Sequence, residues 1–185
     1  VAAEVETSFQ EYRFDLAAQA IYGFTWNEYC DWYLELSKVV LNDPKAGAAA
    51  QRGTRRTLVQ VLETLLRLLH PITPFITEEI WQRVAALAGK NGATIMREPY
   101  PLADTTVIDH EAVKEMRWVM SVVAGIRNIR GEMDIAPSKL LPVLLQDASV
   151  QDLACLERNR ATLATLARTE SITCLKPGDA APESA

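Results

Sequence analysis

Few side chains in this sequence have the type and spacing that acid–base or nucleophilic chemistry needs. His70 precedes Pro71 at the expected end of a helix, where an imidazole ring caps carbonyl groups or packs in the core. Glu78 and Glu79 are adjacent in an expected helix and do not face one another, which favours capping and solvation over paired-carboxylate catalysis. The sequence contains no HExxH, GxSxG or glycine-rich phosphate-loop motif. We therefore predict no catalytic residues in this chain.

Metal and disulfide chemistry is equally poorly supported. Cys30, Cys155 and Cys174 are far apart, odd in number and without a CxxC pair, so we expect no disulfide and a reducing, cytoplasmic compartment. The two histidines, His70 and His110, are too few to build a zinc site with these cysteines. We expect this chain to bind no metal ion and no cofactor of its own.

The composition is that of a folded, soluble domain. Apolar residues make up 49% of the 185 residues, and no apolar run reaches the roughly 20 residues of a membrane-spanning helix. The chain starts at Val1 without an initiator methionine or a signal-peptide pattern, which predicts a piece of a longer protein. The formal charge of −5 counts against a nucleic-acid binder, although net charge does not say where the charges lie.

A long helical pattern extends from about Phe9 to Leu41. At about 100° per residue, one face collects large apolar side chains and is predicted to be buried. This face carries Trp26, Tyr29, Cys30, Tyr33, Leu36, Val40 and Leu41, with Trp32 and Val39 at its border. Gly23 predicts a kink or a break between two helices, and Asn42-Asp43-Pro44 ends the pattern.

Two further helices complete a predicted antiparallel bundle. Lys45–Gly53 is expected to be a loop, and the helix over Thr54–His70 is apolar on nearly every side, which predicts a central position. Thr73 is expected to cap the next helix through its hydroxyl, with Pro74 in the first turn and Gly89 at the end. The predicted core face of that helix carries Ile76, Ile80, Trp81 and Val84.

Pro99 and Pro101 mark a boundary, so we expect one domain over residues 1–101 and a small α/β module over residues 102–185. The module is expected to hold a helix (109–132), a strand (140–145), a helix (149–168), a strand (171–175) and a frayed tail (176–185). The buried stripe of its first helix is predicted to be Val113, Met116, Val119, Met120, Val123 and Ile126. Two strands make a marginal sheet, so we expect a third strand outside this chain, the alternative being support by helices alone.

Four segments, in the same order, resemble the valyl-tRNA synthetase family, a class I aminoacyl-tRNA synthetase. They are YRFDLAA (12–18), FTWNEYCDWYLE (24–35), LHPITPFITEEIW (69–81) and IRNIRGEMDIAP (126–137). The third segment also resembles isoleucyl and leucyl relatives, whereas the second and fourth point to valyl enzymes. The resemblance implies a mainly α fold: the helical anticodon-binding bundle of these enzymes, followed by a small α/β module.

The resemblance also implies the activity of a parent protein. That parent joins valine to valine tRNA, using ATP and Mg²⁺ in a catalytic domain, and an editing domain hydrolyses mischarged threonine, which a valine pocket rejects poorly. Both domains would belong to the same parent chain, and neither is contained in this sequence. We expect a monomer that binds valine tRNA and that stops before the coiled-coil arm of the family.

Unpaired anticodon bases are read by stacking on flat side chains and by hydrogen bonds to base edges. The candidates for such contacts are Arg13, Tyr22, Asn27, Asp31 and Trp32. Phosphate contacts are expected at Arg127, Arg130 and Lys139, and a second basic group is formed by Arg52, Arg55 and Arg56. Trp26, Tyr29 and Tyr33 are predicted to be core residues instead, because they lie on the apolar face.

Two alternatives follow from the same residues. Arg127 lies near Glu132 and Asp134 in sequence, so it has intramolecular partners available. The net negative charge also suits a helical protein-interaction module. A further alternative is that the chain is the equivalent domain of an isoleucyl or leucyl relative.

Overall fold

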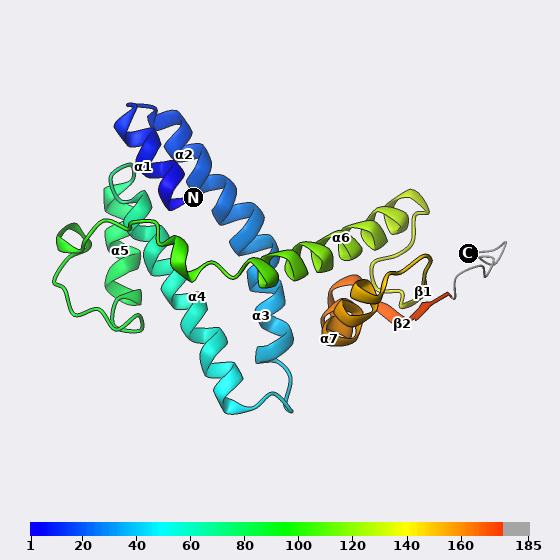
Figure 1. The fold of residues 1–185 in the computed structure, drawn as a ribbon. Coiled ribbons are helices and arrows are strands. Elements are labelled where there is room, and N and C mark those ends of the chain that lie inside the picture. The colour runs from blue at the N-terminus through cyan, green and yellow to red at the C-terminus, as the bar shows by residue number, and fades with distance from the viewer. Residues whose placement is uncertain (176–185) are drawn as a thin grey trace. The chain divides into compact units, whose positions relative to one another are not determined.

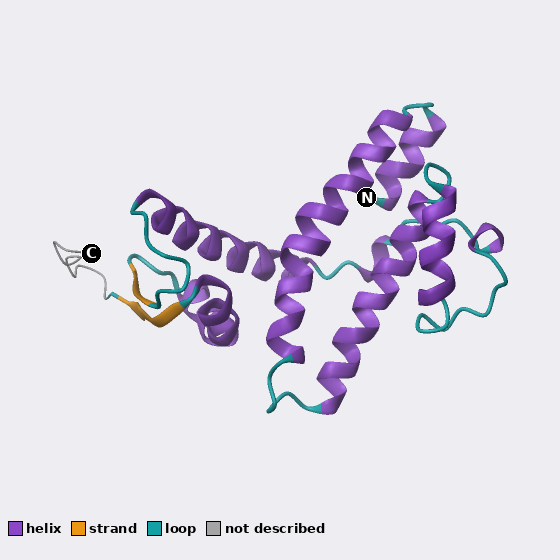
Figure 2. Cartoon of the chain, turned by 180° about the vertical axis from the view of Figure 1, so that it is seen from behind, coloured by secondary structure: helices purple, strands orange, loops and turns teal. Residues whose placement is uncertain are grey.

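The computed structural model describes residues 1–175 and divides into two compact units (Figure 1). The first unit is Val1–Ile108 and the second begins at Asp109, so the stretch from residue 102 to 108 belongs with the first unit. Among the described residues, the strands are confined to the second unit (Figure 2). No helix within residues 1–175 is long and apolar enough to cross a membrane. The tail predicted over residues 176–185 lies outside the described residues.

A turn at residues 11–13 separates the first two helices of the first unit, and the predicted pattern, which began at about Phe9, contained neither this turn nor most of the first helix. Helix α1 spans Ala2–Gln10 and α2 spans Phe14–Gly23. Tyr12 between them has a left-handed φ of 56°, a conformation in which the chain leaves a helix. The break expected at Gly23 is wrong, because the helix continues through η1 (Phe24–Tyr33) into α3 (Leu34–Leu41).

The middle segment of this long helix, η1, is a π-helix. Its i→i+5 hydrogen bonds widen the turn, so the angular step of an α-helix no longer says which side chains share a face. Tyr29 is buried as predicted, and its hydroxyl donates to the Leu58 carbonyl oxygen at 2.9 Å. The prediction that Trp26 is buried is wrong, since this side chain is 56% exposed.

Helix α4 (Ala48–Leu69) is the central helix of the first unit, as its sequence predicted. Leu65 and Leu68 pack in one apolar cluster with α1, α2 and η1, whereas Leu66 packs in a second cluster with α5. The loop expected up to Gly53 is wrong from Ala48 onward. Three consecutive alanines favour helix strongly enough to extend α4, and the exposed Gly53 reduces this stability by only about 1 kcal/mol.

A buried carboxylate links α4 to α5. The Glu63 carboxylate is buried and accepts hydrogen bonds from Nε and Nη2 of Arg67, each at 2.9 Å. It also accepts the indole N–H of Trp81 at 3.0 Å, and Trp81 is fully buried. Arg67 in turn donates to the Pro99 carbonyl oxygen at 2.6 Å. These contacts connect α4, α5 and the chain that follows α5.

Helix α5 spans Pro74–Val84 and is followed by turns that end at Gly89, where φ is 75°. Trp81 faces the core as predicted, and Ile80 and Val84 pack against it, but Ile76 in the first turn is exposed. The predicted capping by the Thr73 hydroxyl is wrong, since this buried oxygen has no hydrogen-bond partner within residues 1–175.

The two acids of α5 bind separate partners. Glu78 accepts hydrogen bonds from the Thr94 hydroxyl at 2.7 Å and from the Ile95 N–H at 3.2 Å. Hydrogen bonds from Gln82, Thr94 and Ile95 lower the pKa of Glu78. Glu78 therefore holds the loop that carries η2 (Ile95–Arg97) against α5, while Glu79 forms an exposed pair with Arg83. A second short helical turn, η3 (Thr105–Val107), ends the first unit.

The second unit follows the predicted order of elements closely. It contains α6 (His110–Glu132), β1 (Leu141–Leu145), α7 (Val150–Ala167) and β2 (Thr169–Cys174). The side chains of Asp109 and Ser149 cap the two helices, and β1 and β2 pair in parallel through the α7 crossover. Among the residues described, the sheet has these two strands, and the prediction of a third one outside this chain stays a prediction.

Helix α6 packs against α7 through much of its predicted stripe. Val119, Val123 and Ile126 are buried, but Val113 in the first turn is exposed. Val113 lies four residues from the N-cap Asp109, in the first turn of α6.

Candidate functional site

The most distinctive exposed feature of the first unit is a parallel pair of aromatic rings, Tyr22 and Trp26. Tyr22 lies in the last turn of α2 and Trp26 in the first turn of η1, and they are 68% and 56% exposed. Their ring centroids are 6.4 Å apart and their planes differ by 1°. Such rings present flat apolar faces to solvent, on which another planar group can stack.

Polar side chains continue from this pair along η1. Asn27 and Asp31 are exposed, and within residues 1–175 neither side chain has a hydrogen-bond partner. An amide both donates and accepts, whereas a carboxylate accepts only, so the two offer complementary groups to the edge of a nucleobase. Trp32 is half-buried and already interacts within the chain, which makes it a weaker candidate than Trp26.

Arg13 is engaged by its near neighbour Asp15. Its Nε and Nη2 donate to the two carboxylate oxygens at 2.9 and 2.7 Å. The hydrogen bond from Arg13 lowers the pKa of Asp15 to about 2. Asp15 therefore stays ionised around neutral pH, and any RNA phosphate must compete with it for Arg13.

The three phosphate candidates of the second unit differ in their surroundings. Arg127 is exposed and donates from Nη2 to the Leu166 carbonyl oxygen at 3.4 Å, and Lys139 is also exposed. Arg130 is buried, and it donates to the carbonyl oxygens of Ala136, Lys139 and Arg168 at 3.3, 2.7 and 2.6 Å. Its guanidinium group joins the end of α6 to the chain around β1 and β2, so we do not place it in an RNA-binding surface.

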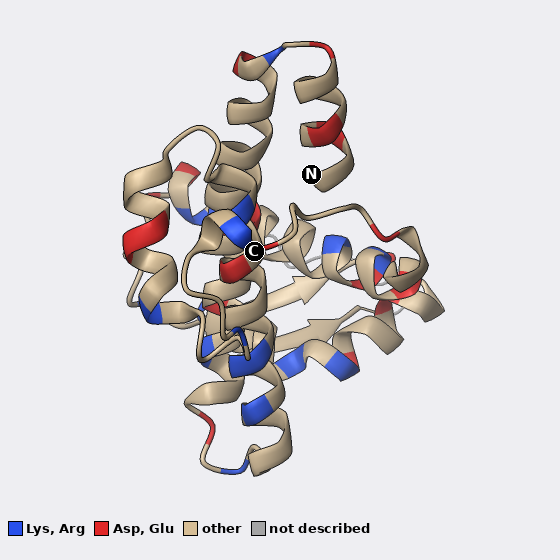
Figure 3. Ribbon diagram, turned by 90° about the vertical axis from the view of Figure 1, so that its left-hand side faces the viewer, with Lys and Arg blue, Asp and Glu red and all other residues tan. Residues whose placement is uncertain are grey.

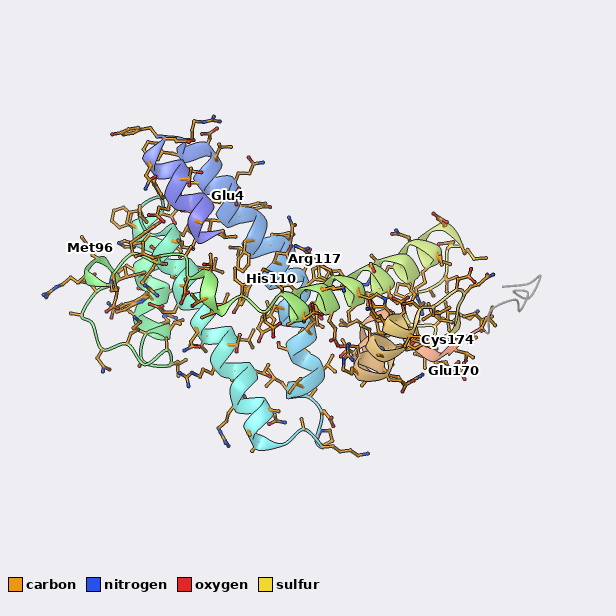
Figure 4. All side chains as sticks on the ribbon, in the orientation of Figure 1. Glu4, Met96, His110, Arg117, Glu170 and Cys174 are labelled. Atoms are coloured by element: carbon orange, nitrogen blue, oxygen red, sulfur yellow. The ribbon has the colours of Figure 1, made fainter. Side chains whose placement is uncertain are left out.

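Replacing Arg130 by lysine is expected to lower the free energy of unfolding of the second unit by about 1–3 kcal/mol. One ammonium group cannot reach all three carbonyl oxygens that the arginine fork satisfies, so buried acceptors lose their partners. Hydrogen exchange of the α6 and β2 amides measures the loss. The control is Arg117→Lys on the exposed surface of α6 (Figure 4), which should stay within about 0.5 kcal/mol of the unchanged chain. Equal protection from hydrogen exchange in both variants would contradict a stabilising role of the three hydrogen bonds of Arg130.

The second basic group lies on α4. Arg52, Arg55 and Arg56 are exposed at spacings of three and four residues, which places them on one face of this helix. They line an open groove together with Leu58, Val59 and Leu87.

Trp26 was predicted to be a core residue, whereas its neighbour Tyr22 was predicted to contact RNA. The signal in the sequence was the i, i+4 spacing of Tyr22 and Trp26, because residues at this spacing lie side by side on a helix. The spacing does not say whether they face the core or the solvent. The π-helical geometry of η1 turns Trp26 toward the solvent, and no local pattern in the sequence predicts a π-helix there.

Comparison with known protein families gives a match over most of the chain. The family model described as the anticodon-binding domain of tRNA ligase matches residues 1–145. The match therefore covers the whole first unit and continues through α6 and β1 of the second.

Proposed function

We propose that this chain, which belongs to the anticodon-binding domain family of tRNA ligases, binds the anticodon arm of valine tRNA. Binding to a tRNA anticodon follows from the family. The choice of valine rests on the segments over residues 24–35 and 126–137, which resemble valyl-tRNA synthetases in particular.

The observation that carries the proposal is the exposed, parallel Tyr22–Trp26 pair. Bases of an anticodon loop are unpaired and leave their faces free to stack on aromatic rings, while their edges remain open to hydrogen bonds. The rings take the face of a base, and Asn27 and Asp31 on the adjoining surface take base edges. This arrangement suits RNA, because aromatic rings stack on any base and the polar groups distinguish one base from another.

The chemistry of the proposed parent, a valyl-tRNA synthetase, belongs to other domains of the same chain. Those catalytic and editing domains would use ATP and Mg²⁺, join valine to its tRNA and remove mischarged threonine. The present chain positions valine tRNA for both reactions. We propose that it works as a monomer in the cytoplasm.

Binding to three anticodon-arm hairpins tests the choice of tRNA. The 185-residue chain is titrated with fluorescent hairpins that share one stem and carry the valine, isoleucine or leucine anticodon. We expect the valine hairpin to bind about tenfold more tightly, because one mismatched base edge leaves polar groups unpaired at about 1–3 kcal/mol. Equal affinity for the three loops would rule out valine selection by this chain, and a preference for another loop would assign it to that relative.

A protein-docking role is favoured by a separate set of exposed apolar side chains in the first unit. Phe75 on α5 is 90% exposed, and Met96 projects from η2 (Figure 4). Exposed large apolar groups commonly mark a protein contact. Because this set lies in other elements than Tyr22 and Trp26, docking of the parent's remaining domains there is compatible with RNA binding.

A further inference from the structure

The three arginines of α4 differ from most basic side chains of the first unit. Arg13, Lys38, Arg67, Arg83 and Lys90 each form an ion pair with a carboxylate. Arg52, Arg55 and Arg56 have no hydrogen-bond or ion-pair partner anywhere in the described part of the chain. Three like charges within two turns of helix repel one another, so a bound anion would relieve an unfavourable interaction that the fold itself leaves uncompensated.

The charge around these arginines is of one sign. The whole chain carries −5, yet residues 44–62 hold Lys45, Arg52, Arg55 and Arg56 and no aspartate or glutamate. Figure 3 shows the resulting run of basic positions along the N-terminal half of α4. An acidic protein thus carries one segment in which every charged side chain is positive.

Beneath the arginines lies a groove of about 800 Å³ with an apolar floor. Leu58 and Val59 of α4 form one side, and Leu87, from the turns after α5, forms the other. Ala49 and Gly53 also line the groove, and neither carries a side chain larger than a methyl group. A cationic rim over an apolar floor suits a polymer with charged phosphates and flat, less polar sugars and bases.

The groove is joined to the element that carries the aromatic pair. Leu58 is one of the residues that line the groove, and its carbonyl oxygen accepts a hydrogen bond from the hydroxyl of Tyr29 in η1. The same turn of α4 thus supports both η1 and the groove floor. An RNA strand with one base on Trp26 therefore has a basic surface on the neighbouring helix of the same unit.

We propose that Arg52, Arg55 and Arg56 form a phosphate-binding track that holds the RNA backbone without reading its sequence. This inference rests on the proposed anticodon-arm binding. Guanidinium groups pair with phosphates through parallel N–H donors, and such contacts position a nucleic acid without selecting bases. An acidic protein segment is the competing occupant, and the test below separates the two.

The test removes the three charges and keeps the helix. The variant Arg52→Gln/Arg55→Gln/Arg56→Gln retains residues of good helix propensity. The matched control Lys38→Gln/Arg83→Gln/Arg97→Gln removes the same charge from other exposed positions of the first unit. Both are titrated with the valine anticodon-arm hairpin and with a hairpin of unrelated loop sequence, at several salt concentrations, and circular dichroism checks the helix content.

We expect the α4 variant to bind both hairpins roughly tenfold more weakly at about 0.1 M salt, with a log–log salt slope shallower by about one to two. The control should change affinity by less than about twofold, because Lys38 and Arg83 are already paired with Glu35 and Glu79. Equal losses in both variants would show an effect of net charge alone and overturn the inference. So would unchanged RNA binding of the α4 variant together with lost binding of polyglutamate, which would assign the groove to an acidic protein.

The same titration keeps this inference apart from the proposed function. A Tyr22→Ala/Trp26→Ala variant that loses RNA affinity while the α4 variant does not would leave anticodon binding in place and remove the phosphate track. No measurable RNA binding by the unchanged chain would overturn both.

Discussion

Replacing Glu63 by leucine is expected to destabilise the first unit by about 3–5 kcal/mol. The substitution leaves the Arg67 guanidinium, whose side chain is 13% exposed, without its carboxylate. It also leaves the buried indole N–H of Trp81 without an acceptor. An uncompensated charge and an unpaired donor inside a core each carry a desolvation penalty that leucine cannot offset.

Urea denaturation followed by circular dichroism measures this loss. The double variant Glu63→Leu/Arg67→Met is the informative control, since removing both charges restores an apolar contact between α4 and its surroundings. It should be more stable than Glu63→Leu alone, because the buried charge has gone with its partner. A Glu63→Leu variant as stable as the unchanged chain would show that the contact between α4 and α5 does not depend on this network.

Alanine at Tyr22 and at Trp26 is expected to produce the largest loss of RNA affinity. Each stacked base contributes about 1–3 kcal/mol, so each substitution should weaken anticodon-arm binding about 5- to 150-fold. Both side chains are more than half exposed, and their removal should change the stability of the fold little. Fluorescence anisotropy of a labelled hairpin at fixed salt measures the affinity.

Two controls give this prediction its specificity. Trp26→Phe keeps an aromatic face and should recover most of the affinity that Trp26→Ala loses. Phe75→Ala removes an even more exposed ring from α5 of the same unit and should leave RNA binding unchanged. If Phe75→Ala weakened binding as much as Trp26→Ala, the effect would reflect general surface apolarity, and the aromatic pair would lose its assigned role.

The sequence by itself determined the elements whose ends carry strong local signals. The helices predicted to begin near Asp109 and Ser149 do begin there, with these two side chains as caps, and the predicted end at Gly89 coincides with a positive φ. The central place of α4 also followed from its sequence, because a helix apolar on most sides is stable only when neighbours cover it. These features depend on residues within a few positions of one another.

Tertiary structure alone decided which side chains those elements expose. The π-helical turns of η1 turn Trp26 toward solvent and Tyr29 toward α4, against the α-helical pattern that grouped them. Arg130 lost its predicted role because chain segments distant in sequence bring three carbonyl oxygens to it. The burial of Glu63 depends likewise on Trp81, a partner from the next helix. Such outcomes depend on contacts between distant residues, which the periodicity of one segment does not contain.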